Sequence, residues 1–215
     1  MGEGGAGRRI GILGGTFNPP HLAHLLCAQE AQDQLGLDHV LLIPVARPPH
    51  KEAAADPGPD VRLELCRLAV GDDERFSVSD IEVRRGGASY TVDTLRALHA
   101  AFPGNELSFI VGGDMAFSLP TWREPAEVLG LARLAIAERE GARQADILER
   151  LALIPGAADR VDFFDLPRMD LSSSLVRRRV AAGHPIRYLV TDPVAAYIAQ
   201  HELYRSSVAT PSPSA

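Results

Sequence analysis

The sequence predicts an α/β fold in which a parallel β-sheet is flanked by helices, and two observations support this prediction. Short apolar stretches alternate along the chain with longer stretches of helical periodicity, as expected of strands joined by crossover helices. Two of the apolar stretches also end in glycine turns, Gly14-Gly15 and Gly112-Gly113, and open parallel sheets bind ligands at such strand ends. The chain has 215 residues, 46% of them hydrophobic, which suffices for one α/β core with a small addition.

The expected elements follow one another along the chain. Strands are predicted at residues 9–13, 40–44, 107–111, 134–137 and 161–164, and an extended segment at 76–84. Helices are predicted at residues 21–35, 60–70, 91–102, 124–129, 145–153, 172–182 and 192–201. No strand follows residue 171, so we expect a main domain at 8–171 and a helical C-terminal subdomain at 172–205. The Ser- and Pro-rich residues 206–215 are predicted to form a disordered tail.

Charge and composition exclude several classes of protein. The formal net charge is -6, whereas nucleic-acid and membrane-surface binding require a basic field, so neither partner is expected. No run of about 18 apolar residues is present, and residues 1–9 lack the apolar core of a signal peptide. Cys27 and Cys66 lie in helical patterns and are expected to be free and buried. The sequence therefore predicts a cytoplasmic protein, and it predicts no particular oligomeric state.

The stretch of residues 10–26 carries the densest chemical signals in the chain. Its apolar strand runs into Gly14 and Gly15, where the absence of side chains lets a ligand approach the backbone closely. Asn18 is a good helix N-cap and Pro19 suits the first helical position, so a helix is expected to begin there. A helix N-terminus offers unpaired N–H groups and a positive dipole end, which together favour phosphate.

Two histidines, His21 and His24, lie three residues apart on the first turn of this helix. Alone, such a pair could be a metal pair or polar surface. No third ligand has suitable spacing, so no protein-bound metal is expected. With the neighbouring Gly14-Gly15-Thr16-Phe17 segment, the histidines favour contact with phosphate. The segment does not spell Gly-x-Gly-x-x-Gly, and no Gly-Lys-Ser/Thr occurs, which disfavours a dinucleotide-dependent dehydrogenase or a P-loop kinase.

A second cluster follows the strand at residues 107–111. Asp114, after Gly112 and Gly113, is placed either to accept a hydrogen bond from a ribose hydroxyl or to cap the next helix. Trp122, the only tryptophan, lies among proline and charged residues. It is interpreted either as a stacking surface for a flat ring or as core packing.

A third cluster spans residues 171–179 and combines serines at a helix start with three arginines. The serines present N–H groups and hydroxyls, and Arg177, one turn later, can reach the same anion. The alternative is a solvated basic face, and helical geometry prevents all three arginines from pointing at one ligand. Lys51, the only lysine, heads the loop after the second strand, where it is a candidate phosphate-binding arm.

These motifs together carry a family resemblance. Residues 14–24, Gly-Gly-Thr-Phe-Asn-Pro-Pro-His-Leu-Ala-His, resemble the nucleotide-binding motif of the class I nucleotidylyltransferases. Taken with residues 48–51, 90–95, 112–122 and 172–179, the chain resembles the bacterial nicotinate-nucleotide adenylyltransferases from about residue 10 to residue 204. The first motif identifies only the superfamily, whereas the set in this order is much more specific.

The resemblance implies a Rossmann-like domain with a small helical C-terminal part, and a reaction. The family transfers the adenylyl group of ATP to nicotinic acid mononucleotide, giving nicotinic acid adenine dinucleotide and pyrophosphate. Because the acceptor phosphate is already a nucleophile, in-line attack needs no covalent intermediate, and positioning with electrostatics can carry the catalysis. Mg²⁺ is expected to bind through the ATP phosphates and water.

The resemblance also assigns roles to residues of this sequence. The implied catalytic residues are His21, His24 and Arg177. The implied ATP-binding residues are Gly14, Gly15, Thr16, Phe17, Lys51, Gly112, Asp114 and Ser173. The implied residues for the nicotinate ring and carboxylate are Thr91, Trp122, Arg123 through its backbone, and Arg139. Asn18 stands where many members have Asp, and Ala23 stands where the superfamily pattern has Gly, which tightens the space beside the phosphate.

Two rival hypotheses remain at this stage. An adenylyl- or cytidylyltransferase with another phosphorylated acceptor, such as phosphopantetheine, shares the first motif, although Trp122 and the Tyr90-Thr91 segment favour a flat aromatic acceptor. A nucleotide-binding regulatory module without turnover is disfavoured by the presence of both histidines and Arg177.

Overall fold

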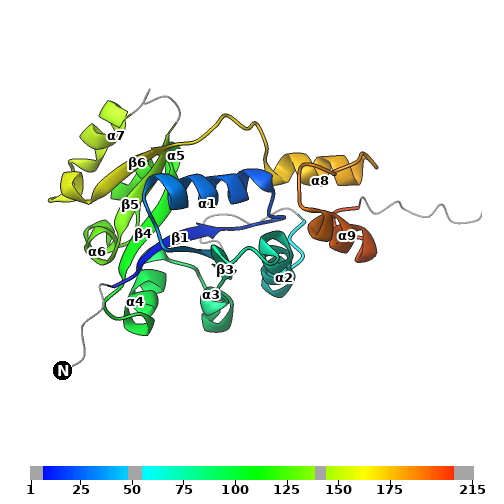
Figure 1. Ribbon diagram of the computed structural model, residues 1–215, viewed down its shortest axis with the longest axis horizontal. Coiled ribbons are helices and arrows are strands. Elements are labelled where there is room, and N and C mark those ends of the chain that lie inside the picture. The colour runs from blue at the N-terminus through cyan, green and yellow to red at the C-terminus, as the bar shows by residue number, and fades with distance from the viewer. Residues whose placement is uncertain (1–6, 48–54, 139–143, 206–215) are drawn as a thin grey trace, which may run out of the picture.

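The protein is built around one parallel sheet with helices on both faces (Figure 1). The computed structural model describes residues 7–47, 55–138 and 144–205. Within these residues the sheet has six strands in the order β3-β2-β1-β4-β5-β6, and every neighbouring pair is parallel. The strands are β1 (Arg9–Gly15), β2 (His39–Pro44), β3 (Phe76–Val78), β4 (Glu106–Gly112), β5 (Arg133–Glu138) and β6 (Val161–Asp165).

The connections between the strands are mainly helical. The α-helices are α1 (Leu22–Gln34), α2 (Pro59–Val70), α3 (Ile81–Arg85), α4 (Thr91–Ala101), α5 (Gly113–Ser118), α6 (Pro125–Leu131), α7 (Gln144–Leu151), α8 (Ser173–Ala181) and α9 (Asp192–Gln200). Two short 3₁₀ turns, η1 (Leu119–Thr121) and η2 (Ala157–Arg160), complete the regular structure of the described residues. The α/β fold expected from the sequence is confirmed.

One expected element is wrong in part. The extended segment predicted at residues 76–84 ends at Val78, and residues 81–85 form the short helix α3. The chain turns there because Ser79 Oγ accepts a hydrogen bond from the Ile81 N–H at 3.3 Å. Glu82 is then buried, and it accepts a hydrogen bond from the Thr94 hydroxyl of α4. Thr94 lies 12 residues further along the chain, in another helix, so local periodicity does not predict this anchor.

Alternate residues of the apolar strands supply the core on the two faces of the sheet. Leu41 and Ile43 of β2 pack on the face covered by α4 and α6, whereas Val40 and Leu42 pack on the face covered by α1. The strands are buried on both faces, so they read as continuous apolar runs rather than as an alternating pattern. Gly11 in β1 allows close packing, because a Cβ there would lie 2.8 Å from a methyl group of Leu37.

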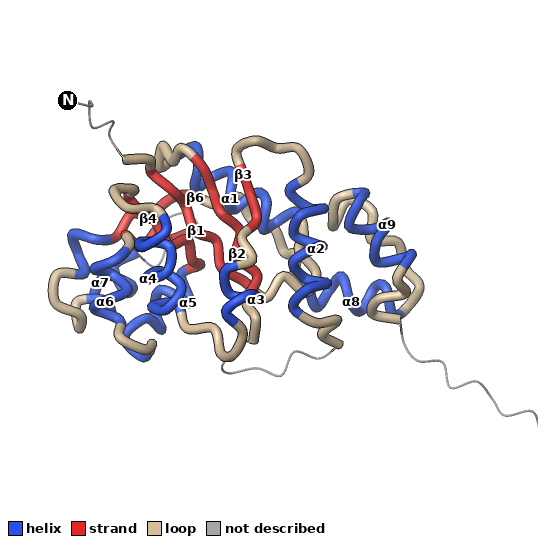
Figure 2. The backbone as a smooth tube through the Cα atoms, turned by 90° about the horizontal axis from the view of Figure 1, so that it is seen from below, coloured by secondary structure: helices blue, strands red, loops and turns tan. Residues whose placement is uncertain are grey.

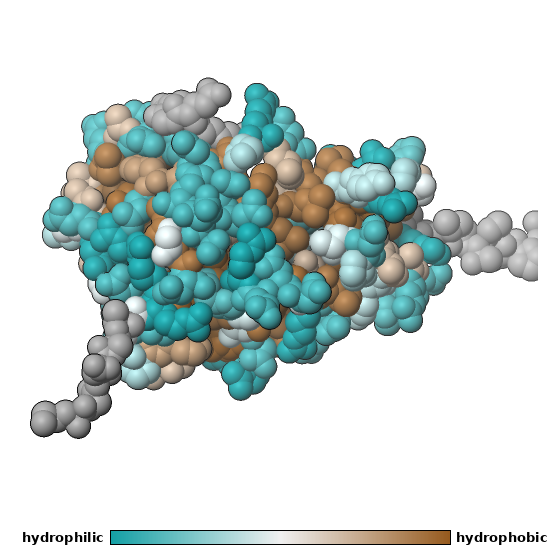
Figure 3. All heavy atoms as spheres, in the orientation of Figure 1, coloured by the Kyte–Doolittle hydropathy of each residue, from teal (hydrophilic) through white to brown (hydrophobic). Residues whose placement is uncertain are grey.

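The last two helices lie at one end of the molecule, far from α4 and α6 (Figures 1 and 2). They share a third core cluster with α2, in which Leu65 packs with Val176 and Val194. Figure 3 shows apolar side chains gathered between this end and the sheet, on a face that is otherwise mostly hydrophilic. The helical C-terminal part is therefore joined to α2 by an apolar contact, and the domain division at residue 171 remains a prediction. The tail predicted at residues 206–215 lies outside the described residues.

The cysteines and the helix lengths can also be compared with the expectations from the sequence. Cys27 and Cys66 are both free thiols, as expected, and burial raises the pKa of Cys27 to about 12. Across the described segments, no helix has the length and apolar character needed to cross a membrane.

Candidate functional site

The candidate site lies where the chain order of the sheet reverses, between β1 and β4. From β1 the chain continues through β2 to β3 on one side, and β4 to β6 lie on the other side. Leu13 of β1 is paired with Ile110 of β4, so Gly15 and Gly112 both lie two residues beyond this pair. The carboxyl ends of strands at such a reversal form the ligand-binding crevice of open α/β sheets. The structure thus brings the two glycine turns to one edge.

The loop after β1 folds back beneath the strand. Phe17 is buried and has a φ of 48°, in the left-handed region that L residues seldom adopt. Its ring lies under Gly15, where a Cβ would come within 3.1 Å of the ring. At Gly14 a Cβ would be 3.5 Å from Phe109, an ordinary contact. A side chain at Gly15 would therefore crowd the Phe17 ring, whereas Gly14 is exposed at the end of the strand.

The expected helix cap at Asn18 is wrong, although the helix begins one residue after the predicted residue 21. Asn18 and Pro19 lie outside α1, the N-cap is His21, and the helix begins at Leu22. Asn18 does not cap the helix because its Oδ1 accepts a hydrogen bond from the Tyr204 hydroxyl at 2.7 Å. Residues from opposite ends of the chain thus decide where this helix begins.

The two histidines form a compact stacked pair. The ring centroids of His21 and His24 are 3.6 Å apart with an interplanar angle of 22°, and Phe17 meets the His24 ring edge-on at 4.9 Å. The His21 backbone N–H donates to Nδ1 of His24 at 3.1 Å. Since Nδ1 accepts this bond, the neutral His24 ring carries its proton on Nε2. His24 is therefore fixed as a hydrogen-bond donor through Nε2.

Both imidazoles are neutral at physiological pH. Burial lowers the pKa of His21 to about 4 and, together with the charge of His21, lowers the pKa of His24 to about 3. Nδ1 of His21 is buried and has no hydrogen-bond partner within the described part of the chain. Burial disfavours the protonated form of both rings. An anion bound against them would raise their pKa values again, because a nearby negative charge favours the protonated form.

The lowered pKa values predict a pH-dependent stability. The unfolded chain, with histidine pKa near 6.5, binds more protons than the folded chain below that pH, so the free energy of unfolding should fall from about pH 6.5 toward about pH 4. Urea unfolding at several pH values measures this slope. A double variant, His21→Leu with His24→Leu, should show a shallower decline, and an equal slope in both proteins would contradict the prediction.

The C-terminal helix α8 anchors the loop that precedes α1. Ser173 Oγ donates to the Pro19 carbonyl at 2.8 Å, and Arg177 Nη1 donates to the Asn18 carbonyl at 2.6 Å. Arg177 Nη2 donates to Ser174 Oγ at 3.2 Å, so two of the five N–H donors of its guanidinium are used. No carboxylate within the described residues pairs with Arg177. Its charge therefore remains available to an anion.

Arg179 points elsewhere, in agreement with the expectation that the three arginines do not all reach one ligand. Arg179 Nε donates to the Pro185 carbonyl at 2.9 Å, within the loop after α8. Of the three consecutive arginines, Arg177 is the one that contacts the loop between β1 and α1. The third cluster of the sequence is thus joined to the first through the Arg177 guanidinium and the Ser173 hydroxyl.

Arg62 of α2 is the main residue that sequence reasoning missed. It is fully buried at 0% exposure, and its Nη1 donates to the carbonyls of Thr16 at 3.0 Å and Val45 at 2.7 Å. Nη2 donates to the Ala46 carbonyl at 3.0 Å, and Nε pairs with Asp56 at 2.9 Å. One guanidinium therefore ties the loop after β1 to the loop after β2.

The sequence does contain a signal for this burial. Arg62 lies four residues before Cys66 and seven before Ala69, so it shares a helix face with two buried apolar residues. A charged residue on an apolar face indicates a buried, hydrogen-bonded role.

The residues expected to receive an aromatic acceptor lie in α4 and just after η1, which pack on the face of the sheet opposite α1. Thr91 is the first residue of α4, and Trp122 is the C-cap directly after η1. The Trp122 ring packs edge-on against Phe109 at 6.1 Å, and its Nε1 donates to Ser118 Oγ at 3.0 Å. Trp122 is half-buried, so it both packs on the core and leaves surface exposed. Arg123 lies over the Tyr90 ring, with its guanidinium carbon 4.9 Å from the centroid.

The remaining candidates have these positions. Asp114 is exposed in the first turn of α5, whose N-cap is Gly112, so the cap interpretation of Asp114 is wrong. At Gly112 a Cβ would meet nothing within 4 Å, which leaves that strand end uncovered. Ala23 lies half-buried in the first turn of α1. Lys51 and Arg139 lie outside the described residues.

Comparison with known proteins defines the class of this site. The cytidylyltransferase-like family model matches residues 12–179, from within β1 to within α8. The matched region contains both glycine turns, the histidine pair and Arg177. Fold and site therefore define a nucleotidyltransferase of the cytidylyltransferase-like class.

Curated relatives narrow this class. A protein of Herpetosiphon aurantiacus is 46% identical over 197 residues, covering 92% of this chain and 98% of its own length. Relatives from Geobacter sp. strain M21 and Desulfitobacterium hafniense strain Y51 are 44% and 43% identical, covering 91% and 92% of this chain and 98% and 96% of their own lengths. All three are named "Probable nicotinate-nucleotide adenylyltransferase". The chain belongs to the nicotinate-nucleotide adenylyltransferase family.

Solved structures agree on the fold. The nicotinic acid mononucleotide adenylyltransferase of Plasmodium falciparum, complexed with NaAD, superposes with a TM-score of 0.72 at 17% identity. The alignment covers 92% of this chain and 97% of that chain. The same enzyme complexed with APC gives a TM-score of 0.70 at 16% identity, with the same coverage. The sheet and its helices are thus shared well beyond sequence similarity.

Proposed function

We propose that this protein transfers the adenylyl group of ATP to nicotinic acid mononucleotide, forming nicotinic acid adenine dinucleotide and pyrophosphate in NAD biosynthesis. A phosphate oxygen of the mononucleotide attacks the α-phosphorus of ATP, and the bond from that phosphorus to the bridging oxygen of the leaving pyrophosphate breaks. The attacking oxygen is already anionic, so no covalent intermediate and no strong base are needed. The protein aligns the two nucleotides and stabilises charge on the transferring phosphoryl group.

The phosphates are bound at the end of β1 in this proposal. His24 donates through Nε2, the tautomer that its bond from the His21 N–H favours. His21 and Arg177 act on the same phosphates, and Ser173 holds the loop that leads into α1. Gly14, Gly15, Thr16 and Phe17 bring the backbone of this loop close to ATP, and Lys51 adds a further positive charge. The observation that carries the proposal is this stacked, neutral histidine pair beside an arginine that has no carboxylate partner among the described residues.

The remaining candidates surround the two nucleosides. Gly112 and Asp114, at the end of β4, lie beside the adenosine ribose. Thr91 and Trp122 receive the nicotinate ring, and the main-chain N–H of Arg123 binds the carboxylate, for which Arg139 is a further candidate.

A divalent metal ion accompanies ATP in this family, and we propose that it is Mg²⁺. The described residues contain no group of three His, Cys, Asp or Glu side chains arranged to hold an ion. The donor set at the end of β1 consists of N–H groups and imidazoles, which suits an ion bound through phosphate oxygens and water. When bound, the ion screens the triphosphate charge.

A pyrophosphate-release assay with ATP and a panel of acceptors tests the proposal. Nicotinic acid mononucleotide should support turnover, and nicotinamide mononucleotide in parallel measures selectivity for the carboxylate. Turnover with phosphopantetheine alone would assign the protein to the rival transferase. ATP binding without pyrophosphate release from any acceptor would support a regulatory module, and either result would overturn the proposal.

A further inference from the structure

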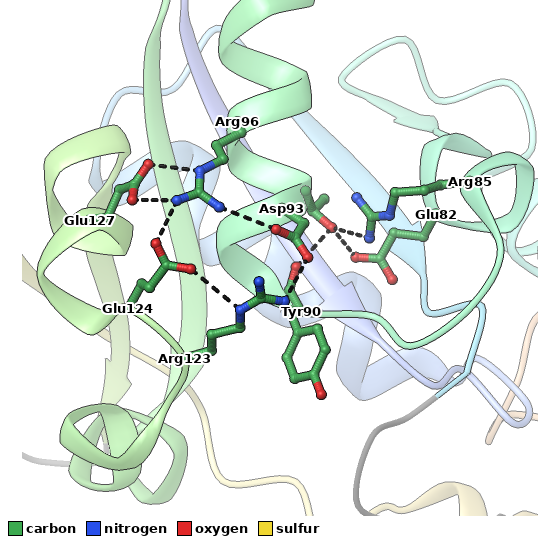
Figure 4. Close-up of polar contacts among 9 residues, drawn as sticks. Glu82, Arg85, Tyr90, Asp93, Arg96, Arg123, Glu124 and Glu127 are labelled. Carbon is green, nitrogen blue, oxygen red and sulfur yellow. Dashed lines mark hydrogen bonds and ion pairs between the residues drawn. The ribbon is translucent and has the colours of Figure 1, made fainter.

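An ion-pair cluster of five residues includes Arg123, one of the candidate acceptor residues (Figure 4). We call Asp93, Arg96, Arg123, Glu124 and Glu127 the acceptor-side cluster. Arg96, on α4, is its centre: Nε contacts Glu127 Oε1 at 2.7 Å, Nη2 contacts Glu124 Oε2 at 2.6 Å, and Nη1 contacts Asp93 Oδ1 at 3.3 Å. A second contact to Glu127 makes that pair bidentate. Arg96 thus joins α4 both to α6 and to the loop before it.

Arg123 closes the cluster from the loop side. Its Nη1 lies 3.4 Å from Asp93 Oδ2, and its Nε lies 3.3 Å from Glu124 Oε1. Its guanidinium also lies over the Tyr90 ring. The cluster contains three carboxylates and two guanidinium groups, so its own carboxylates already neutralise the Arg123 charge. The Arg123 side chain is therefore poorly placed to serve as a free counter-ion for an acceptor carboxylate.

The main chain held by the cluster has an uncommon conformation. Glu124 has a φ of 51°, in the left-handed region, and joins Trp122 and Arg123 to the first turn of α6. Such a conformation persists in an L residue when its surroundings hold it. Here two arginines hold the Glu124 carboxylate, Arg96 at 2.6 Å and Arg123 at 3.3 Å.

The backbone held in this way carries two main-chain N–H donors on exposed residues, Arg123 and Glu124. The backbone N–H groups of Arg123 and Glu124 donate to no partner within residues 7–47, 55–138 and 144–205. They follow directly after Trp122, whose own N–H is bonded to the Leu119 carbonyl at 2.9 Å. The direction of these donors depends on the backbone of residues 122–124, and this backbone is held from outside by Arg96.

We infer that Arg96 is a positioning residue for acceptor recognition, which holds the backbone of residues 122–124 through Glu124 and Glu127. This inference rests on the proposed function, because it concerns the acceptor side of that reaction. The Arg96 side chain is 39% exposed, so water screens its ion pairs, and we expect the stability lost with them to stay modest even though the pair with Glu127 is bidentate. Loss of Arg96 should therefore affect acceptor binding more than folding.

Steady-state kinetics of Arg96→Gln test the inference. The KM for nicotinic acid mononucleotide should rise about tenfold, whereas kcat at saturating acceptor and the KM for ATP should stay within about twofold of the parent values. The preference for the nicotinate over the nicotinamide mononucleotide should also fall. Glu127→Gln, which weakens the bidentate pair from the other side, should change the same parameters in the same direction. Arg96→Lys keeps the charge without the planar fork, so it should be intermediate.

The matched control is Arg133→Gln. Arg133 begins β5 and makes a bidentate ion pair with Asp162, with contacts of 2.5 Å and 2.9 Å and 32% exposure. This pair lies at the opposite end of the strands from the site, so its loss should leave both KM values unchanged. Thermal unfolding midpoints of the two glutamine variants show whether their effects on stability are comparable.

The possible results separate the positioning role of Arg96 from the proposed function of the protein. Unchanged acceptor KM and selectivity in Arg96→Gln and Glu127→Gln would overturn the positioning role, even if the parent protein is active. An equal loss in kcat and in affinity for both substrates would also overturn it, because that pattern indicates general damage to the fold. Failure of the parent protein to use nicotinic acid mononucleotide would instead overturn the proposed function itself.

Discussion

Replacing His24 with alanine is expected to lower kcat about 10²- to 10³-fold, the range for losing one preorganised donor to a transition state. The donor is preorganised because the His21 N–H occupies Nδ1 at 3.1 Å and leaves the proton on Nε2. Stacking on His21 and the edge contact with Phe17 fix the ring plane. The measurement is turnover at saturating ATP and acceptor, and His21→Ala is expected to fall in the same range.

His39 provides the matched control for this prediction. Burial also lowers its pKa, and its Nε2 lies 2.7 Å from Ser77 Oγ, but it begins β2 at the opposite end of the strands. His39→Ala should therefore leave turnover unchanged. A His24 variant with raised KM and unaltered kcat would assign the imidazole to ground-state binding and contradict a transition-state role.

Replacing Arg62 with methionine is expected to reduce the free energy of unfolding by about 3 to 5 kcal/mol, the cost of breaking a buried ion pair from one side. The variant leaves the carbonyls of Thr16, Val45 and Ala46 without their donor and leaves Asp56 without its partner. Urea unfolding measures the loss directly. Turnover should fall as well, because the loop that leads from β1 to the histidine pair contains Thr16.

Arg67→Met on the same helix is the control. Arg67 is 52% exposed and pairs with Glu64 at 3.5 Å, so its loss should change the free energy of unfolding by less than about 1 kcal/mol. Equal effects of the two substitutions would show that the contacts of Arg62 with the two loops contribute no special stability.

The sheet could be predicted because its signal is local. Strands buried on both faces must be apolar at consecutive positions, and residues 109–111 and 134–137 meet this condition without reference to the rest of the chain. The strand order also brings Gly15 and Gly112 to one edge, where the sequence placed a ligand site. Short elements were less predictable: α3 depends on the burial of Glu82 against Thr94.

The detailed geometry of the site depended on contacts between distant segments. Local preference favours Asn18 as a helix cap, but Tyr204, 186 residues later, takes its side-chain oxygen, and His21 becomes the N-cap. Arg177 was predicted to approach an anion near the first motif, and the structure places it on the Asn18 carbonyl. Its role toward substrate remains a prediction.

The sequence by itself determined the α/β class, the two glycine turns and the residue types available for phosphate chemistry. Each of these follows from periodicity or from the chemistry of a short segment. The tertiary structure alone decided where the first helix begins, which ring nitrogen of His24 carries the proton, and that Arg62 joins two loops from within the core. These depend on hydrogen bonds and burial that exist only after distant segments pack together, because a buried donor takes whichever acceptor the fold brings to it.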